Sequence, residues 1–186
     1  MFALILGVII WSLVHFVPAT AVDFRSSLIK KLGLNPYKGI FALLLVGSLA
    51  LMVLGWKSAP VEFLYASPLW GRWITAIAML LTSILFIAPY ISNSLGRVIR
   101  HPQLTGVMIF GIAHLVSNGE SRSIILFGGL AAWAFLEMLL INRRDGAWQK
   151  PADKPVFNFR LILAGLGFFA LVVAVHPWLF GVSPVP

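Results

Sequence analysis

The stretch FALILGVIIWSLVHFVPATA, residues 2–21, contains no Asp, Glu, Lys or Arg. Spanning a bilayer core takes about 20 mainly apolar residues in a helix, so this stretch predicts a membrane-spanning helix. A secretory signal would carry its basic residues before the apolar run, but here they follow it. The run also contains a histidine, His15. We therefore interpret it as a retained first span.

The composition of the whole chain supports a membrane protein. Of its 186 residues, 60% are hydrophobic and only 11% are charged, whereas a soluble domain carries about 25% charged residues. The absence of cysteine excludes disulfides, thiolate-ligated haem or zinc, and iron–sulfur clusters. The net charge of +8 comes from basic residues in short loops, a distribution typical of membrane topology. We expect a lipid bilayer around the chain and no nucleic-acid partner.

Apolar segments of suitable length recur along the chain. The turn 117–121 is short, so the fourth and fifth segments are expected to form a helical hairpin. Short loops throughout favour one compact domain over residues 1–186. The expected fold class is all-α, a polytopic membrane bundle of about six transmembrane helices. The predicted spans are 2–22, 39–56, 70–91, 103–118, 123–142 and 159–180.

Positive charge predicts the orientation of the bundle. The second and fourth loops hold only Lys57, Arg72 and Arg122. Loops rich in Lys and Arg stay in the cytoplasm, so both termini are expected on the outer side. Tryptophans near the span ends fit an aromatic belt: Trp56, Trp70, Trp73, Trp148 and Trp178. The basic residues of the odd loops are Arg25, Lys30, Lys31, Lys38, Arg97, Arg100, Arg143, Arg144, Lys150, Lys154 and Arg160.

Two histidines, His15 and His114, lie within predicted spans, where ionisable side chains are costly. Counting about 1.5 Å per helical residue from the inner boundaries places His15 roughly 12 Å deep and His114 roughly 17 Å deep. Glu137 lies about 9 Å from the same side by the same count. The similar depths would suit a flat cofactor with one imidazole on each side. The plainer interpretation of each histidine is a neutral imidazole in an interhelical hydrogen bond.

Several site chemistries remain open for these residues. A neutral imidazole is a standard axial ligand of haem iron. Zinc is an alternative, because His15, His114 and Glu137 could supply three ligands. Glu137 could instead form a salt bridge to Arg143 or Arg144, carry a proton, or orient a liganding histidine. His176 is expected to lie at the outer interface without a further role.

A conspicuous motif, Arg100-His101-Pro102-Gln103-Leu104-Thr105-Gly106, opens the fourth span. Proline suits the first turn of a helix, and the free N–H groups of that turn can receive an anion. The stretch resembles a motif of integral-membrane methyltransferases that bind S-adenosylmethionine, including the isoprenylcysteine carboxyl and phospholipid methyltransferases. Those enzymes carry a second, acidic Arg-containing element, to which Asn142-Arg143-Arg144-Asp145 corresponds in part.

A broader resemblance covers most of the chain, from His15 to about Trp148. Arg100-His101-Pro102-Gln103, Ala113-His114, Asn118-Gly119 and Arg143-Arg144-Asp145 resemble the NnrU family of membrane proteins. The plant 15-cis-zeta-carotene isomerases, which use haem b to isomerise a cis double bond, are similar over the same core. The resemblance implies axial histidines at His15 and His114. Bacterial NnrU proteins are associated with denitrification and nitrogen-oxide metabolism, which implies a multi-pass protein of the bacterial inner membrane.

The leading hypothesis is therefore a haem b protein with His15 and His114 as metal ligands and Glu137 as a further catalytic residue. It is expected to act as a redox-gated isomerase on a lipophilic substrate or as a factor in nitrogen-oxide metabolism. A membrane methyltransferase and a non-enzymatic haem sensor or electron carrier are the alternatives. The polar residues expected to hold the cofactor are Arg100, His101, Gln103, Asn118, Arg143 and Arg144.

Overall fold

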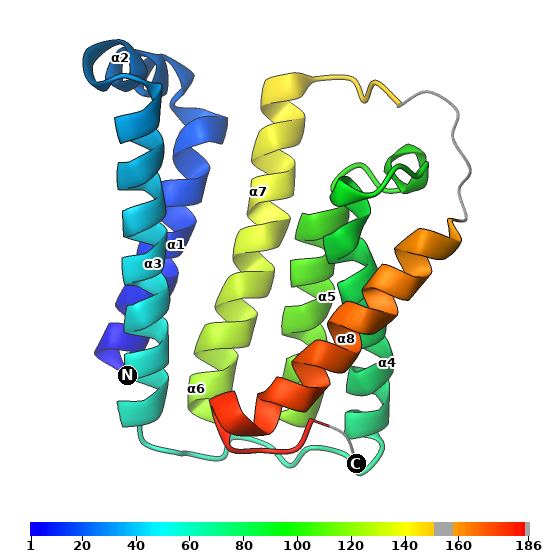
Figure 1. The fold of residues 1–186 in the computed structure, drawn as a ribbon. Helices are drawn as coiled ribbons and strands as arrows, with labels where there is room; N and C mark the ends of the chain where they lie inside the picture. Colours follow the sequence, from blue (N-terminus) through cyan, green and yellow to red (C-terminus); the bar gives the residue numbers. More distant parts are fainter. Residues whose placement is uncertain (151–157, 185–186) are drawn as a thin grey trace.

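A computed structural model describes residues 1–150 and 158–184, and over these residues the protein is built from helices (Figure 1). A single β-bridge joins Phe63 to Glu120, and no longer strand occurs in the described part. The main helices are α1 (Phe2–Thr20), α2 (Val22–Leu32), α3 (Leu34–Ser58), α4 (Gly71–Ile87), α5 (Pro102–Ser117), α6 (Ser121–Ser123), α7 (Gly129–Asp145) and α8 (Phe159–Phe180). Short turns η1 (Ala88–Tyr90), η2 (Leu95–Arg97) and η3 (Ile124–Gly128) complete the set.

The all-α membrane fold predicted from the sequence is confirmed. Five helices of the described chain are long and apolar enough to cross a membrane: α1, α3, α4 extended by η1, α8, and the continuous helix Ser121–Asp145. The remaining predicted span, α5, has 16 residues and is shorter than the others. The last span has the predicted bounds, whereas α3 begins at Leu34 instead of 39 because Pro36 fits the first helical turn.

The first inner loop contains a helix, α2, which the sequence analysis does not predict. None of its residues is buried. Phe24, Leu28 and Leu32 recur at helical spacing along one side, while Lys30 and Lys31 occupy the last turn, where cations complement the helix dipole. In Figure 1 α2 lies across the end of the bundle, above α1 and α3. The amphipathic pattern is typical of a helix that rests at a membrane surface.

The long helices pack in the spatial order α3, α1, α7, α5, α4 and α8, with α7 between two groups (Figure 1). Glycines allow the closest approaches between neighbouring helices. A Cβ atom at Gly7 would lie 2.8 Å from the Ser48 carbonyl oxygen of α3, and one at Gly165 would lie 2.6 Å from the Ile84 side chain of α4. The predicted hairpin of the fourth and fifth spans is present, because α5 packs on α7.

A polar contact holds α4 against α5 inside the bundle. The Thr75 hydroxyl donates to the Ala113 carbonyl oxygen at 2.8 Å and lies 2.6 Å from the Ser117 hydroxyl. Thr75 is buried, so these bonds satisfy groups that neither water nor lipid could reach. The contact fixes the height of α5, and therefore of His114, relative to α4.

The two ends of the bundle carry different charge. The N-terminus and the end of α8 lie at one end, and α2, the start of α5 and the end of α7 lie at the other (Figure 1). All described basic residues of the odd loops gather at this second end, called here the inner end, as the charge pattern predicts. Lys154 lies outside the described residues.

Candidate functional site

His15 lies on α1 in a cage of aromatic rings. Its ring centroid is 4.4 Å from that of Trp11, 4.7 Å from that of Trp133 on α7 and 5.8 Å from that of Phe41 on α3. Trp11 and Trp133 also meet edge to face at 5.5 Å. The imidazole is therefore placed where α1, α3 and α7 meet.

His114 lies on α5 in a second aromatic cluster. Its ring stacks on Phe127 at 4.4 Å and lies 4.3 Å from the Phe110 ring. Phe127 belongs to the π-helical turn η3, a wide turn that is frequent at functional sites. The Gly111 position allows this approach, since a Cβ there would collide with the Phe127 carbonyl oxygen and lie 2.8 Å from the Ala131 side chain.

Both imidazoles are held in the same tautomer. His15 Nδ1 lies 2.9 Å from the Trp11 carbonyl oxygen, and His114 Nδ1 lies 2.9 Å from the Phe110 carbonyl oxygen. A carbonyl oxygen only accepts, so each Nδ1 carries the proton and donates. Each Nε2 is then left with its lone pair, which is the form in which imidazole binds a metal.

The structure places the two histidines in different aromatic clusters. His15 contacts Trp133 and His114 contacts Phe127, and these two residues are six positions apart, about 9 Å along a helix. A metal–imidazole bond is about 2 Å long, so two axial imidazoles must approach one another across a single ion. In this packing each histidine presents its own Nε2 in its own aromatic cluster.

Glu137 is the third residue that the sequence places within a span. Its side chain is on α7, one turn after Trp133, and only 6% of the residue is exposed. Its Oε2 atom has no hydrogen-bond partner among the described residues. The predicted salt bridge to Arg143 or Arg144 is not formed, because the Arg144 guanidinium is directed to other partners.

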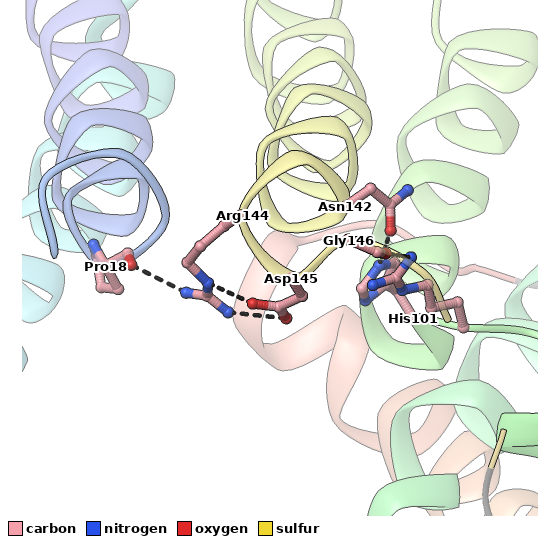
Figure 2. Close-up of polar contacts among 7 residues, drawn as sticks. Pro18, His101, Asn142, Arg144, Asp145 and Gly146 are labelled. Carbon is pink, nitrogen blue, oxygen red and sulfur yellow. Dashed lines mark hydrogen bonds and ion pairs between the residues drawn. The ribbon is translucent and has the colours of Figure 1, made fainter. Parts of the chain in front are cut away.

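Arg144 connects the end of α7 to the end of α1 (Figure 2). Its guanidinium donates to the Pro18 carbonyl oxygen at 2.9 Å and pairs with both carboxylate oxygens of Asp145, at 2.6 and 3.1 Å. The last four carbonyl groups of a helix lack partners within it, and a cation there complements the helix dipole. Arg144 therefore caps α1 from a neighbouring helix.

The Arg-His-Pro-Gln motif and the Asn-Arg-Arg-Asp motif meet at the same end (Figure 2). His101 Nε2 lies 2.9 Å from the Asn142 side-chain oxygen, and Arg100 donates to the Gly146 carbonyl oxygen at 3.0 Å. Gly146 has a φ of 67°, which favours glycine, and ends α7 there. The two motifs thus join the start of α5 to the end of α7.

The remaining predicted cofactor residues are dispersed. Gln103 Nε2 donates to the Phe86 carbonyl oxygen at 3.4 Å and to the Tyr90 hydroxyl at 3.3 Å. Asn118 Nδ2 donates to the His114 carbonyl oxygen at 2.8 Å, at the opposite end of α5. Arg143 is exposed at the inner end. Gln103 and Asn118 bond at opposite ends of α5 and do not surround one space.

The zinc alternative is not supported. Among the described residues no group of three or more His, Cys, Asp or Glu side chains could hold a metal ion. His15 and His114 lie in separate clusters, so the set proposed with Glu137 does not assemble.

The aromatic residues around both histidines are not among the site residues predicted from the sequence. Trp11 precedes His15 by four positions and Trp133 precedes Glu137 by four, so each pair shares a helix face. That spacing is a signal the sequence contains. The stacking of Phe127 on His114 depends on the π-helical turn, which no residue pattern announces.

The fold and these buried polar groups define the class of the protein: a multi-pass α-helical membrane protein with ionisable residues inside its bundle. The model of the NnrU protein family matches residues 3–184, and the chain therefore belongs to the NnrU family. No curated protein and no solved structure matches the chain.

Proposed function

We propose that this NnrU-family protein binds haem b in the membrane, with His15 and His114 as iron ligands. The observation that carries the proposal is the shared tautomer of the two histidines. In both, a backbone carbonyl oxygen holds Nδ1–H at 2.9 Å and leaves Nε2 as the donor atom that haem iron takes. Aromatic side chains around each imidazole would pack against a flat apolar macrocycle.

Each histidine by itself fits an axial ligand, because its Nε2 keeps a lone pair inside an aromatic cluster. The helix contacts place α7 between α1 and α5. Bound haem would supply an iron centre able to change its ligation. Arg100 and Arg144 at the inner end could pair with the propionates, although both now bond to backbone carbonyl oxygens.

The finer activity that we propose is isomerisation of a cis double bond in a lipophilic substrate, or a role in nitrogen-oxide metabolism in the bacterial inner membrane. Substrates of the first kind would reach the histidines from the bilayer. If purified protein holds haem but turns over no polyene, the sensor or electron-carrier alternative gains support.

The test is the haem content of detergent-purified protein, measured as the pyridine haemochrome. We expect haem in the wild type and its loss or strong reduction in His15→Ala and in His114→Ala. His176→Ala is the matched control, because His176 also lies in a span and bonds its Nδ1 to a carbonyl oxygen, that of Val182, at 2.9 Å. Haem that persists unchanged in both His15→Ala and His114→Ala would overturn the proposal.

A second candidate, an S-adenosylmethionine-dependent methyltransferase, is favoured by one observation. An open pocket of about 240 Å³ lies beside the start of α5 and is lined by Arg100, His101 and Gln103, among others. Calorimetric titration of the purified protein with S-adenosylmethionine tests it. Binding that Arg100→Ala abolishes would support this candidate, and a flat titration would remove it.

A further inference from the structure

The helix α2 has two chemically different sides. Phe24, Leu28 and Leu32 recur every fourth residue, so they form one apolar stripe along the helix. Ser27 and Lys30 lie on the other side. Phe24 and Leu32 are 57% and 44% exposed, so the described chain leaves much of this stripe uncovered. An open apolar stripe at the end of a membrane bundle is typical of a helix that lies between acyl chains and headgroups.

Two turns of the chain place α2 at the level where the bundle leaves the bilayer. Ala21, between α1 and α2, departs from helical geometry with a φ of −121° and a ψ of 54°. Gly33, between α2 and α3, has a φ of 86°, which favours glycine. The helix α2 therefore lies across the inner ends of α1 and α3 and continues neither of them (Figure 1). Both of those helices are long and apolar enough to span the membrane.

One contact shows which side of α2 faces the bundle. The Arg25 guanidinium lies 5.7 Å from the centre of the Tyr37 ring on α3. Leu28 and Ile29 follow Arg25 by three and four residues, so they share its side of the helix, and both are half-buried. Ser27 is exposed. The apolar side of α2 therefore faces α3 and the bilayer, and the polar side faces away from them.

Lysines on and beside α2 have no partner within the described part of the chain. Lys30, Lys31 and Lys38 are exposed, and none of them makes a hydrogen bond or an ion pair with another described residue. The acidic residue of α2, Asp23, lies in its first turn, whereas Lys30 and Lys31 lie in its last. Positive charge that the described residues do not neutralise therefore lies beside the apolar stripe.

We propose that α2 binds anionic phospholipids of the inner leaflet, with Phe24 and Leu32 among the acyl chains and Lys30 and Lys31 at the level of the phosphates. Charge complementarity selects this partner, because each basic side chain near an anionic leaflet strengthens binding about fivefold. A neutral leaflet offers the same acyl chains, but it carries no net charge to match the lysines. This inference goes beyond haem binding and does not depend on it.

The chain has no cysteine, so a single introduced thiol can carry a fluorophore. Phe24→Cys reports on the apolar stripe, and Ser27→Cys is the matched control on the polar side of the same helix. Leu69→Cys, at a side chain that is 98% exposed in the loop before α4, reports on the outer end. Each labelled protein is reconstituted in phosphatidylcholine vesicles that contain an equal minor share of nitroxide-labelled phosphatidylglycerol or nitroxide-labelled phosphatidylcholine.

We expect both nitroxide lipids to quench Phe24→Cys more than Ser27→Cys, and phosphatidylglycerol to quench Phe24→Cys more than phosphatidylcholine does. Replacing Lys30 and Lys31 together by Gln should lower this preference at least about fivefold. Lys57→Gln is the matched charge control, since Lys57 is exposed in the last turn of α3 at the outer end. It should leave the preference at Phe24→Cys unchanged, and Leu69→Cys should show no preference.

Screening provides a test without removing the lysines. In about 1 M salt the screening length falls to about 3 Å, so the preference for phosphatidylglycerol at Phe24→Cys should disappear. The stronger quenching of Phe24→Cys than of Ser27→Cys should persist, because burial among acyl chains does not depend on charge. A preference that withstands the salt would contradict recognition by the lysines.

Three further results would overturn the proposal. Equal quenching of Phe24→Cys by the two lipids at low salt would show that α2 does not distinguish anionic headgroups. Equal quenching of Phe24→Cys and Ser27→Cys, or none at Phe24→Cys, would show that the apolar stripe does not lie in lipid. A loss of preference in Lys57→Gln as large as in the double variant would show an effect of net charge and no site on α2.

Discussion

At the residue scale, the absence of a Cβ atom at particular glycines determines how closely two helices can pack. Gly55 shows this most sharply, because a Cβ there would overlap the backbone of Leu4 on α1. Gly47 lies on the same helix, but a Cβ there would meet no atom of another element within 4 Å. The two glycines look alike in the sequence, and only the structure separates their roles.

We predict that Gly55→Ala destabilises the protein by about 1–3 kcal/mol, because α1 and α3 must move apart to admit the methyl group. Gly47→Ala should leave stability unchanged or raise it by up to about 1 kcal/mol, because alanine suits a helix interior better than glycine. Unfolding of the detergent-solubilised protein in increasing SDS checks both. Equal stabilities of the two variants would be inconsistent with the close contact of α1 and α3.

The Arg144 bond to Pro18 carries a second prediction at this scale. Arg144→Gln should weaken the capping of α1 by about 0.5–1 kcal/mol, the range of an exposed charged contact. Amide hydrogen exchange around the junction of α1 and α2 should then become about twofold to fivefold faster. Arg143→Gln is the control, since Arg143 is exposed and adjacent in sequence. Equal acceleration in both variants would remove the specific role of Arg144.

At the element scale, the hydropathy pattern predicts every long helix. It does not predict the helix α2, which lies between two of them. The predicted span 159–180 has the observed bounds: in the structure Asn158 caps α8 by accepting from the Arg160 N–H, and Gly181 ends it with a φ of 76°. The helix α2 was missed, because an amphipathic helix at a membrane surface lacks the continuous apolar run used to find spans. Local patterns therefore identify which segments are helical, but not which partner each helix meets.

The same limit applies to the candidate site. His15, His114 and Glu137 could be selected from the sequence, because ionisable residues stand out in apolar runs. Their mutual positions could not, since depth counting gives a height and no direction around the bundle axis. The contacts with Trp133 and Phe127 show that α7 and the turn before it face the two histidines at different levels.

The α4–α5 pair gives a prediction for an element contact. Thr75→Val keeps the shape of the side chain but removes its hydroxyl, which leaves the Ala113 carbonyl oxygen and Ser117 without that partner. We expect a loss of about 0.6–2 kcal/mol in the SDS unfolding assay. Thr20→Val should have little effect, because Thr20 is exposed and bonds only within its own helix, to the Phe16 carbonyl oxygen at 2.8 Å. A neutral Thr75→Val would show that packing alone holds the pair.

At the scale of the whole molecule, charge asymmetry and architecture agree on one orientation. The basic residues of α2, of the segment just before α5 and of the end of α7 lie at the end away from the N-terminus and from the end of α8 (Figure 1). Alkaline phosphatase is active only outside the cytoplasm. A fusion after Ala66, in the loop before α4, should therefore be active, and one after Gly33, between α2 and α3, should be inactive. The reverse activities would contradict this orientation and place α2 on the outer side.

The central claim for the whole molecule is that its histidines bind haem iron, and the absorption spectrum of the purified protein tests this most directly. We predict a Soret band in the oxidised protein and sharp α and β bands after reduction with dithionite, the spectrum of iron held by two imidazoles. A featureless visible spectrum after expression with added haem precursor would contradict the claim.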